Sequence, residues 1–330
     1  MSEIIRVENL TKYFPVQRSL LEQLIARKTD YVKAVDKITF SIERGEIFTL
    51  AGESGCGKTT TGRLLIRLLK PTSGKIFFNN EDTTSFKGEK LRLLRRKMQM
   101  IFQDPYASLN PRMKVGDSIG HPLEIFNVAK GKEKVRTVLD VLDKVGLTPS
   151  EQFVNLYPLQ LSGGQRQRVA LARSIILNPE FMVADEPVSM IDVSLRTTII
   201  DLMLNFRKEL GLTYLFVTHD LAVAKYISDR IAIMYLGKII EMSNKESLFR
   251  EPLHPYTQAL LSAIPIPDPK RKRKAADLKG EVPSAINIPS GCRFRTRCQY
   301  AEKTCEEKEP ELIPIKPDHF VSCFSVENES

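Results

Sequence analysis

The sequence predicts an α/β fold, and three features of its 330 residues lead to this expectation. Apolar runs of strand length recur along the chain, and stretches with helical spacing of apolar residues separate them. One such strand leads directly into a glycine-rich loop and then a helix, an order typical of parallel sheets that bind phosphate groups. The hydrophobic content of 42% and the charged content of 27% are those of an ordinary globular protein with a core.

The glycine-rich loop at residues 52–60 is the most specific motif. It reads G-x-x-x-x-G-K-[ST], follows the apolar run 46–51 and precedes the helical run 61–66. Backbone N–H groups of such a loop converge on an anion, and the helix N-terminus adds a partial positive charge. We expect Lys58 to contact the β- and γ-phosphates and the Thr59 hydroxyl to ligate Mg²⁺. The expected nucleotide-binding residues are Gly52, Glu53, Ser54, Gly55, Cys56, Gly57, Lys58, Thr59 and Thr60. A glycine-rich turn without a ligand is the alternative.

Ahead of the loop, the alternating pattern predicts a strand at 4–10 and another at 35–42. Helical spacing at 19–28 predicts an inserted surface helix between them. Tyr13 follows the first strand. An aromatic residue there is often part of the core, but with a phosphate loop downstream we favour Tyr13 as the platform for a purine base.

Behind the loop, the sequence predicts a strand at 75–78, a very basic helix at 89–97 and a strand at 98–102. The last strand ends at Gln103. A glutamine at a strand end beside a phosphate loop is a candidate ligand of Mg²⁺ and a candidate for orienting water. The alternative is a polar cap on the strand.

A helical region is expected over 115–161, and a further helix is expected over 166–176. Between them lies Ser162, followed by two glycines and Gln165. A serine and two glycines at a helix start form a second anion-binding terminus. Taken alone, the same residues are a flexible helix cap.

Two later strands end in polar residues. The buried run 181–184 ends in Asp185 and Glu186, which we expect to serve Mg²⁺ and a nucleophilic water respectively. The alternative is a polar cap on the next loop. The strand 213–217 is followed by His219, a candidate contact to the γ-phosphate. A lone histidine is usually structural, so its assignment rests on the other motifs.

Charge and hydropathy set the expected location. The formal net charge of +9 fits contact with nucleic acid or anionic lipid, but a solvated surface is favoured. No apolar run approaches the roughly 18 residues that cross a bilayer, and residues 1–14 lack a signal-peptide core. We expect the protein in the cytosol unless a partner holds it at a membrane.

The region after residue 252 is less regular. A helix that begins at a proline is expected within 253–261, and a linker rich in proline and charge is expected over 264–288. Its basic run at 270–274 is expected to be solvated, with contact to lipid head groups as the secondary interpretation.

Four of the five cysteines lie in the tail, with the spacing C-x5-C-x6-C-x17-C. They are Cys292, Cys298, Cys305 and Cys323. Disulfides are disfavoured in the cytosol, which leaves a metal or iron–sulfur centre bound by thiolates. Structural zinc favours pairs with shorter gaps, but zinc and thiols without a metal stay open as the alternatives.

The motifs together resemble an ABC-transporter ATPase subunit over about residues 4–243. The elements that carry the resemblance are Tyr13, the loop at 52–60, Gln103, the signature segment at 161–165, Asp185 with Glu186, and His219. The resemblance implies a P-loop NTPase fold, in which a RecA-like lobe with an antiparallel β subdomain carries an inserted α-helical subdomain. The expected boundaries are 1–103 with 178–245 for the first lobe and 104–177 for the helical subdomain. A helix and linker at 246–290 and a Cys-rich extension at 291–330 complete the chain.

The resemblance also implies how the site is assembled. Two such domains bind head to tail around two ATP molecules, so that the signature residues Ser162, Gly163, Gly164 and Gln165 contact the partner's nucleotide. Glu186 is implied as the general base and His219 as a contact of the γ-phosphate. Asp192 is implied to bridge to the opposite site. Its turn reads Ser-Met-Ile-Asp at 189–192, where the family usually has Ser-Ala-Leu-Asp.

The segments 102–112 and 185–189 and the cysteine tail resemble the second ATPase of oligopeptide/dipeptide importers, a group that also includes nickel and oligosaccharide systems. This implies a homologous second ATPase, two membrane permease subunits that dock near 103–109, and an external substrate-binding protein. It also implies a peripheral position at the cytoplasmic side of the membrane and a [4Fe–4S] cluster on the tail cysteines. Oligosaccharide cargo is the alternative within this family. A soluble relative that acts on nucleic acid or ribosomes is disfavoured, because this chain has neither a long coiled-coil insertion nor a second cassette.

Overall fold

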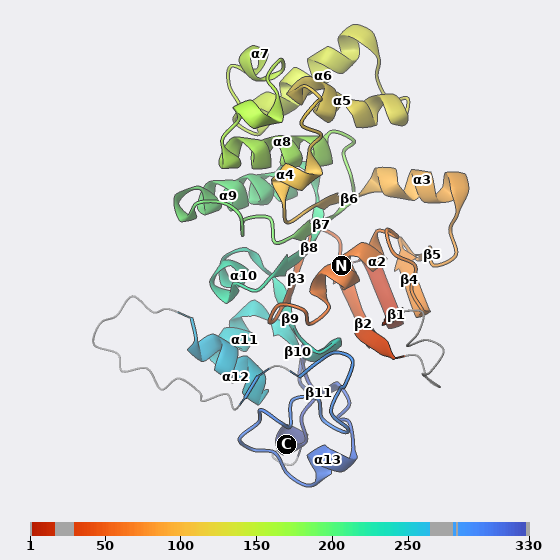
Figure 1. Ribbon diagram of the computed structural model, residues 1–330, viewed down its shortest axis with the longest axis vertical. Helices are drawn as coiled ribbons and strands as arrows, with labels where there is room; N and C mark the ends of the chain where they lie inside the picture. Colours follow the sequence, from red (N-terminus) through yellow and green to blue (C-terminus); the bar gives the residue numbers. More distant parts are fainter. Residues whose placement is uncertain (1, 17–29, 265–279, 282, 328–330) are drawn as a thin grey trace, which may run out of the picture. The chain divides into compact units, whose positions relative to one another are not determined.

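The computed structural model describes residues 2–16, 30–264, 280–281 and 283–327 (Figure 1). Two expected features, the helix at 19–28 and the basic run at 270–274, lie outside these residues. The chain forms two compact units. Unit 1 comprises Glu43–Glu46 and Ser85–Phe216 with the start of the chain, and unit 2 comprises Glu3–Ile42, Ile47–Thr84 and Val217–Ser330.

Unit 2 contains a four-stranded sheet in the order β2-β1-β4-β5. Its strands are β1 (Glu3–Pro15), β2 (Tyr31–Glu43), β4 (Ser73–Phe78) and β5 (Glu81–Asp82). β1 and β4 are antiparallel, with Ile5 opposite Phe78, and both side chains are buried. The strands expected at 4–10, 35–42 and 75–78 are confirmed, and β1 and β2 are longer than expected.

Unit 2 also contains the strand order β11-β12-β10-β9-β3. The strands are β3 (Ile47–Ala51), β9 (Arg230–Tyr235), β10 (Lys238–Asn244), β11 (Ile313–Lys316) and β12 (His319–Val321). β3 is parallel to β9, whereas β9, β10, β12 and β11 are antiparallel in succession. A hairpin from the Cys-rich tail thus extends the sheet that carries the phosphate loop.

A buried carboxylate joins this hairpin to its neighbours. Glu241 on β10 lies 2.7 Å from His319 Nε2 on β12. The same carboxylate accepts the backbone N–H groups of Leu253 at 2.8 Å and His254 at 3.0 Å. Because a buried charge is stable only when it is paired and hydrogen-bonded, Glu241 fixes both partners in place.

The helices of unit 2 are α2 (Lys58–Leu65), α10 (Leu221–Ile227), α11 (Lys245–Arg250), α12 (Pro255–Ser262), α13 (Thr304–Glu307) and α14 (Phe324–Glu327). α11 lies against β9 and β10 (Figure 1). Polar N-caps begin three of the helices: Asp220 for α10, Asn244 for α11 and His254 for α12. The helix expected near 253–261 is confirmed, with a proline at its first position.

Unit 1 contains the strand order β8-β7-β6. The strands are β6 (Met98–Ile101), β7 (Phe181–Asp185) and β8 (Thr213–Thr218), whose last two residues belong to unit 2, and every residue of β7 is buried. β6 and β7 are parallel, with Met98 opposite Phe181. Their carboxyl ends therefore lie side by side, which places the residues after each strand near one another.

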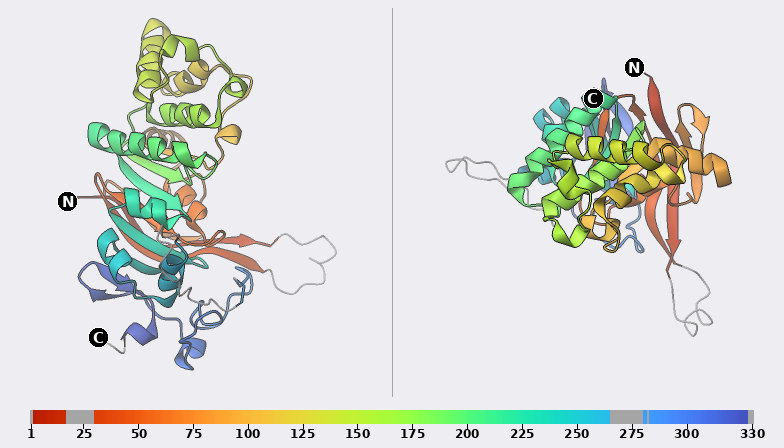
Figure 2. Two further views of the ribbon diagram at one scale, coloured as in Figure 1. Left: turned by 90° about the vertical axis from the view of Figure 1, so that its left-hand side faces the viewer. Right: turned by 90° about the horizontal axis from the view of Figure 1, so that it is seen from above.

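The helices of unit 1 are α3 (Gly88–Lys97), α4 (Pro105–Ser108), α5 (Val115–Ile125), α6 (Gly131–Lys144), α7 (Ser150–Phe153), the 3₁₀ turn η1 (Pro158–Gln160), α8 (Gly163–Ile175) and α9 (Val193–Leu210). α5, α6 and α8 pack on one another and form the yellow-to-green bundle of Figure 2. Buried Ile119, Leu142 and Val169 lie in its interior. The expected helical region over 115–161 is confirmed. In the described part of the chain, none of the helices combines the length and the apolar character that a membrane span needs.

Candidate functional site

The phosphate loop follows β3 and is pressed against neighbouring backbone. Gly52 has φ +149°, and a Cβ atom there would lie 2.3 Å from the carbonyl oxygen of Met234. Gly57 has φ +111°, and its Cβ would lie 2.1 Å from the carbonyl oxygen of Ala34. Both approaches are closer than any side chain allows, so these two positions require glycine. The loop therefore has the tight form that its motif predicts.

Lys58 begins α2 and folds back over the loop. The residue is 4% exposed, and its ammonium group donates to the carbonyl oxygens of Gly52 and Glu53, both at 2.8 Å. The cap of α2 is Gly57, which among the described contacts supplies no side-chain acceptor to the first N–H groups of the helix. N–H groups of this kind can donate hydrogen bonds to a bound anion. The helix begins three residues earlier than the expected 61–66, because Lys58 and Thr59 are themselves helical.

Tyr13 is half-buried in β1, and its hydroxyl donates to Asp36 Oδ1 at 2.7 Å. Burial and the Asp36 carboxylate raise the pKa of Tyr13 to about 12. Burial alone would favour neutral Asp36, but hydrogen bonds from Tyr13 and Arg293 lower the pKa of this carboxyl. The ring orientation of Tyr13 is thus fixed by a charged acceptor.

His219 follows β8 and is exposed. The residues on either side of it are tied down, since Thr218 Oγ1 accepts the N–H of Asp220 at 2.9 Å and the Asp220 carboxylate caps α10. The backbone around His219 is therefore well defined. Tyr13, the phosphate loop and His219 all belong to unit 2.

Gln103 and Glu186 meet in unit 1. Gln103 Nε2 donates to Glu186 Oε2 at 2.9 Å, as the parallel ends of β6 and β7 require. Asp185 is buried at the last position of β7. Glu186 has φ +46°, a conformation that non-glycine residues seldom adopt, and its carbonyl accepts the Ser189 hydroxyl at 3.0 Å and the Ser189 N–H at 3.2 Å. Strain of this kind is frequent at active sites.

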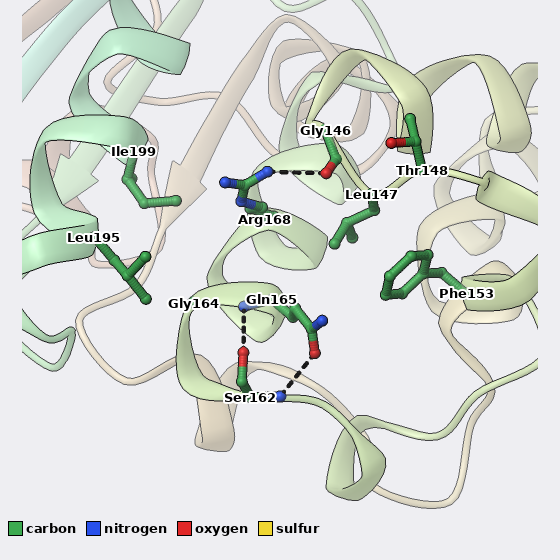
Figure 3. Close-up of a pocket in the computed structure, with 10 residues that line it drawn as sticks. All are labelled: Gly146, Leu147, Thr148, Phe153, Ser162, Gly164, Gln165, Arg168, Leu195 and Ile199. Atoms are coloured by element: carbon green, nitrogen blue, oxygen red, sulfur yellow. Dashed lines mark hydrogen bonds between the residues drawn. The ribbon is translucent and has the colours of Figure 1, made fainter.

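The signature segment forms the start of α8. Ser162 Oγ accepts the N–H of Gln165 at 3.3 Å, and Gln165 Oε1 accepts the N–H of Ser162 at 2.9 Å (Figure 3). This reciprocal pair is a capping box, so α8 begins at Gly163, earlier than the expected 166. The segment lines a pocket together with Arg168, Leu195 and other residues from α7 to α9. A Cβ on Gly164 would lie 2.8 Å from Leu195 Cδ1, whereas one on Gly163 would meet nothing within 4 Å.

Asp192 lies at the N-cap position of the 18-residue helix α9. It is exposed, and its carboxylate makes no side-chain cap bond in the described structure. The turn at 189–192 is confirmed, but the helix that follows it was not part of the expectation.

The four tail cysteines share one neighbourhood in unit 2. Cys292 N–H donates to the carbonyl oxygen of Cys305 at 2.8 Å. The pKa of Cys292 is raised to about 11, mainly by burial and in addition by the neighbouring Cys305, Cys323 and Cys298. All four are free thiols, and as they stand no group of three or more histidine, cysteine or acidic side chains among the described residues is placed to hold a metal ion.

Sequence reasoning missed the residues that join the tail to the loop. Arg297 forms two hydrogen bonds to the carboxylate of Glu53, a partner 244 positions away in the chain. Arg293 makes one hydrogen bond to Asp36, a partner 257 positions away. The sequence does show two arginines, Arg293 and Arg297, at helical spacing between Cys292 and Cys298. It contains no local pattern from which their distant partners could be predicted.

The geometry agrees with the comparisons. Residues 35–189 match the family described as ABC transporter, and residues 240–305 match the oligopeptide/dipeptide transporter C-terminal region. The oligopeptide transport ATP-binding protein AppF of Bacillus subtilis is 47% identical, over 97% of this chain and 96% of that protein. The chain belongs to the ABC transporter ATPase family. A second B. subtilis protein, the putative oligopeptide transport ATP-binding protein YkfD, is 51% identical over 92% of each chain.

Solved structures establish the fold of this ABC transporter ATPase. A dimeric ATP-binding cassette in a post-hydrolysis state with ADP and Pi is 30% identical, with a TM-score of 0.63 over 73% of this chain and 98% of that one. The cbiO1 component of an ABC transporter complex of Clostridium perfringens is 26% identical, with a TM-score of 0.63 over 76% and 92%. The protein is therefore a P-loop NTPase of the ABC cassette type, and ATP hydrolysis coupled to transport is its chemistry.

Proposed function

We propose that this ATPase powers an importer of oligopeptides or dipeptides across the cytoplasmic membrane. The observation that carries the cargo class is the match of residues 240–305 to the C-terminal region of oligopeptide/dipeptide transporters. Relatives at 42–51% identity carry names of oligopeptide or peptide transport proteins. The subunit then works as a peripheral protein on the cytoplasmic face of the membrane.

ATP with Mg²⁺ binds at the phosphate loop. Lys58 leaves the carbonyl oxygens of the loop for the β- and γ-phosphates, and the uncapped N–H groups of α2 face the same anion. Thr59, Gln103 and Asp185 would hold Mg²⁺, which would offset the charge of the phosphates. Tyr13 stacks on the base with a ring that Asp36 already orients.

Glu186 is the general base. Gln103 donates to its carboxylate, and the two bonds from Ser189 to its carbonyl hold the backbone in an unusual conformation. A base held in this way keeps its position while the attacking water is oriented. His219 contacts the γ-phosphate, which it reaches from a rigid turn.

Two cassettes assemble head to tail, with a homologous second ATPase as the partner of this chain. The dimeric state of the related solved cassette supports this arrangement. Ser162, Gly163, Gly164 and Gln165 contact the partner's nucleotide, and exposed Asp192 bridges to the opposite site. In this arrangement the expected lobe 1–103 with 178–245 binds the chain's own nucleotide. The expected helical subdomain 104–177 carries the signature residues that contact the partner's nucleotide. The permeases dock near 103–109, where Tyr106 is exposed, and an external binding protein delivers the cargo.

The tail cysteines would hold a [4Fe–4S] cluster, with zinc as the alternative. Four thiols in one neighbourhood, three of which raise the pKa of Cys292, are a donor set that suits iron–sulfur chemistry, and a bound cation would lower that pKa. The ligands are Cys292, Cys298, Cys305 and Cys323, and the role of the cluster is structural. Anaerobically purified protein should contain iron and acid-labile sulfide in equal amounts. Stoichiometric zinc without sulfide would instead assign the site to zinc.

Replacement of Glu186 by Gln tests the proposed chemistry. The amide keeps the size of the side chain and the contact with Gln103 but no longer accepts a proton from water. We expect MgATP binding to persist and turnover to fall by about 10²-fold or more. Binding is measured by nucleotide titration and turnover by phosphate release from the assembled transporter. Glu180→Gln, an acid on the loop before β7, is the matched control and should leave turnover near that of the unmodified protein. Unchanged hydrolysis in E186Q would refute the role of Glu186.

A further inference from the structure

The cysteine-rich tail reaches the phosphate loop through one buried arginine. Arg297 is 6% exposed at its side chain, and its Nη1 and Nη2 atoms lie 2.8 and 3.1 Å from the two carboxylate oxygens of Glu53. This two-pronged geometry fixes the direction of both side chains. Burial opposes the charge on Arg297, but its hydrogen bonds to Glu53 and the nearby Tyr235 raise its pKa, so the guanidinium stays charged.

Every polar group of Glu53 has a partner in unit 2. Its carboxylate binds Arg297, its N–H donates to Tyr256 Oη at 3.1 Å, and its carbonyl accepts Lys58 Nζ at 2.8 Å. Glu53 is the second residue of the loop, so these contacts set where the loop leaves β3. The position of the loop thus depends on helix α12 and on the tail.

A second arginine of the same segment reaches the base platform. Arg293 is buried and contacts the Asp36 carboxylate that accepts the Tyr13 hydroxyl. Its other donors bind the Leu236 carbonyl and Glu309 Oε1, the latter at 2.8 Å. The segment between Cys292 and Cys298 therefore contacts both ends of the proposed nucleotide site.

Phe294 anchors this segment between its two arginines. Its ring lies 5.4 Å from the rings of Tyr235 and Tyr256 and 5.6 Å from that of His254, measured between centroids. Tyr256 is the same residue whose hydroxyl accepts the Glu53 N–H. Aromatic packing of this kind holds a short segment without regular secondary structure in one place.

We propose that the segment 293–297 is a brace for the nucleotide site, in which Arg297 positions the phosphate loop and Arg293 positions Tyr13. The proposal rests on the nucleotide site described under the proposed function. Arg297 also neutralises the one carboxylate of the loop, which would otherwise repel the phosphates. Neither arginine touches the reacting atoms, so both are positioning residues.

Loss of the brace should weaken binding more than it slows turnover. Arg297→Ala leaves Glu53 charged and unpaired and frees the loop to shift, so we expect the KM for MgATP to rise about tenfold or more. At saturating ATP, kcat should stay within about twofold, because Glu186 and Gln103 are untouched. A general loss of folding would instead lower the active fraction and kcat.

The experiment measures the affinity of the full chain for a fluorescent N-methylanthraniloyl ATP with Mg²⁺, together with kcat and KM in the assembled transporter. Arg297→Lys keeps the charge but makes only a single-pronged contact, so it should restore part of the affinity. In the Glu53→Gln background, Arg297→Ala should change the affinity by less than about twofold, because the residue it acts through is already altered. Arg295→Ala is the matched control, since Arg295 lies between Arg293 and Arg297 in the chain and donates to Ser290 at the surface. It should bind nucleotide like the unmodified chain.

The results of these variants decide between the alternatives. Weak binding in R297A, partly restored in R297K and absent as an added effect on E53Q, supports the brace. Unchanged affinity in R297A, or an equal loss in R295A, overturns it. Lys58→Ala separates this from the site itself: if R297A binds normally while K58A does not, the brace alone is wrong. If K58A also binds normally, the proposed nucleotide site falls and the brace falls with it. Should R297A not fold, Arg297→Gln, which keeps a polar side chain of similar reach without the charge, carries the same test in the unmodified chain and in the E53Q chain.

Discussion

His254 is a residue whose protonation state is fixed by its surroundings. It is fully buried, and its Nδ1 accepts the N–H of Tyr256 at 3.0 Å as the cap of α12. Burial lowers its pKa from 6.5 to about 4, although the charge of Glu241 acts in the opposite direction. The imidazole is therefore neutral in the folded protein at physiological pH.

This shift predicts a loss of stability in mild acid. The unfolded chain takes up a proton at His254 near pH 6.5 and the folded chain only near pH 4, so the contribution is complete above pH 6.5 and is lost as the pH falls toward 4. The full contribution is about 3 kcal/mol. His254→Asn keeps a capping acceptor without a titrating ring, so its free energy of unfolding should fall less steeply between pH 6.5 and 5 in urea titrations. His121→Asn, at an exposed histidine, should leave the slope unchanged. Equal slopes for H254N and the unmodified chain would contradict the assignment.

The same scale shows what the sequence can foresee of the site. Gly52, Gly57, Lys58 and the capping Ser162 were predictable, because each acts on backbone within a few residues of itself. Asp36 and Arg297 were not, because their importance comes from partners far along the chain. A charged residue in a tail without regular pattern is interpreted as a surface residue until its partner is known.

At the scale of elements, the tail is held by packing as well as by charge. Phe294 is 2% exposed and belongs to the apolar cluster that includes Tyr235, Leu248 and Tyr256. β12 pairs with β10 beside it, so the tail is part of the sheet of unit 2. Strands that stand beside a motif, such as β3 before the phosphate loop and β7 before Glu186, were expected correctly. The β11–β12 hairpin was not, because strands of four and three residues carry too little pattern to be recognised.

Phe294→Ala should therefore destabilise the protein strongly. Removal of a buried aromatic ring typically costs about 3–5 kcal/mol through lost burial and the cavity left behind. Tyr300→Ala removes an aromatic ring of the same segment that is 52% exposed, and should change the free energy of unfolding by no more than about 0.5 kcal/mol. Chemical denaturation of the two variants gives the comparison. Similar losses in both would mean that the tail is not packed as described.

At the scale of the whole molecule, the proposed assembly predicts where the protein is found. With its permease partners present, it should sediment with membranes, and expressed without them it should stay in the supernatant of the same centrifugation. The net charge of +9 makes nucleic acid the competing partner, so a nuclease step is the control. Nuclease-sensitive sedimentation with ribosomes would contradict membrane association. The fold class was predictable from the sequence because the motifs occur in one fixed order. The division of the chain into unit 1 and unit 2 was not predictable from the sequence.

The separation of 244 positions between Glu53 and Arg297 has a consequence for biosynthesis. A ribosome delivers the loop early and its clamp near the end of translation. If the brace acts as proposed, a nascent chain that ends before residue 297 would contain every phosphate-binding motif but would bind ATP weakly. High affinity for ATP would therefore develop only when the last part of the chain has been synthesised.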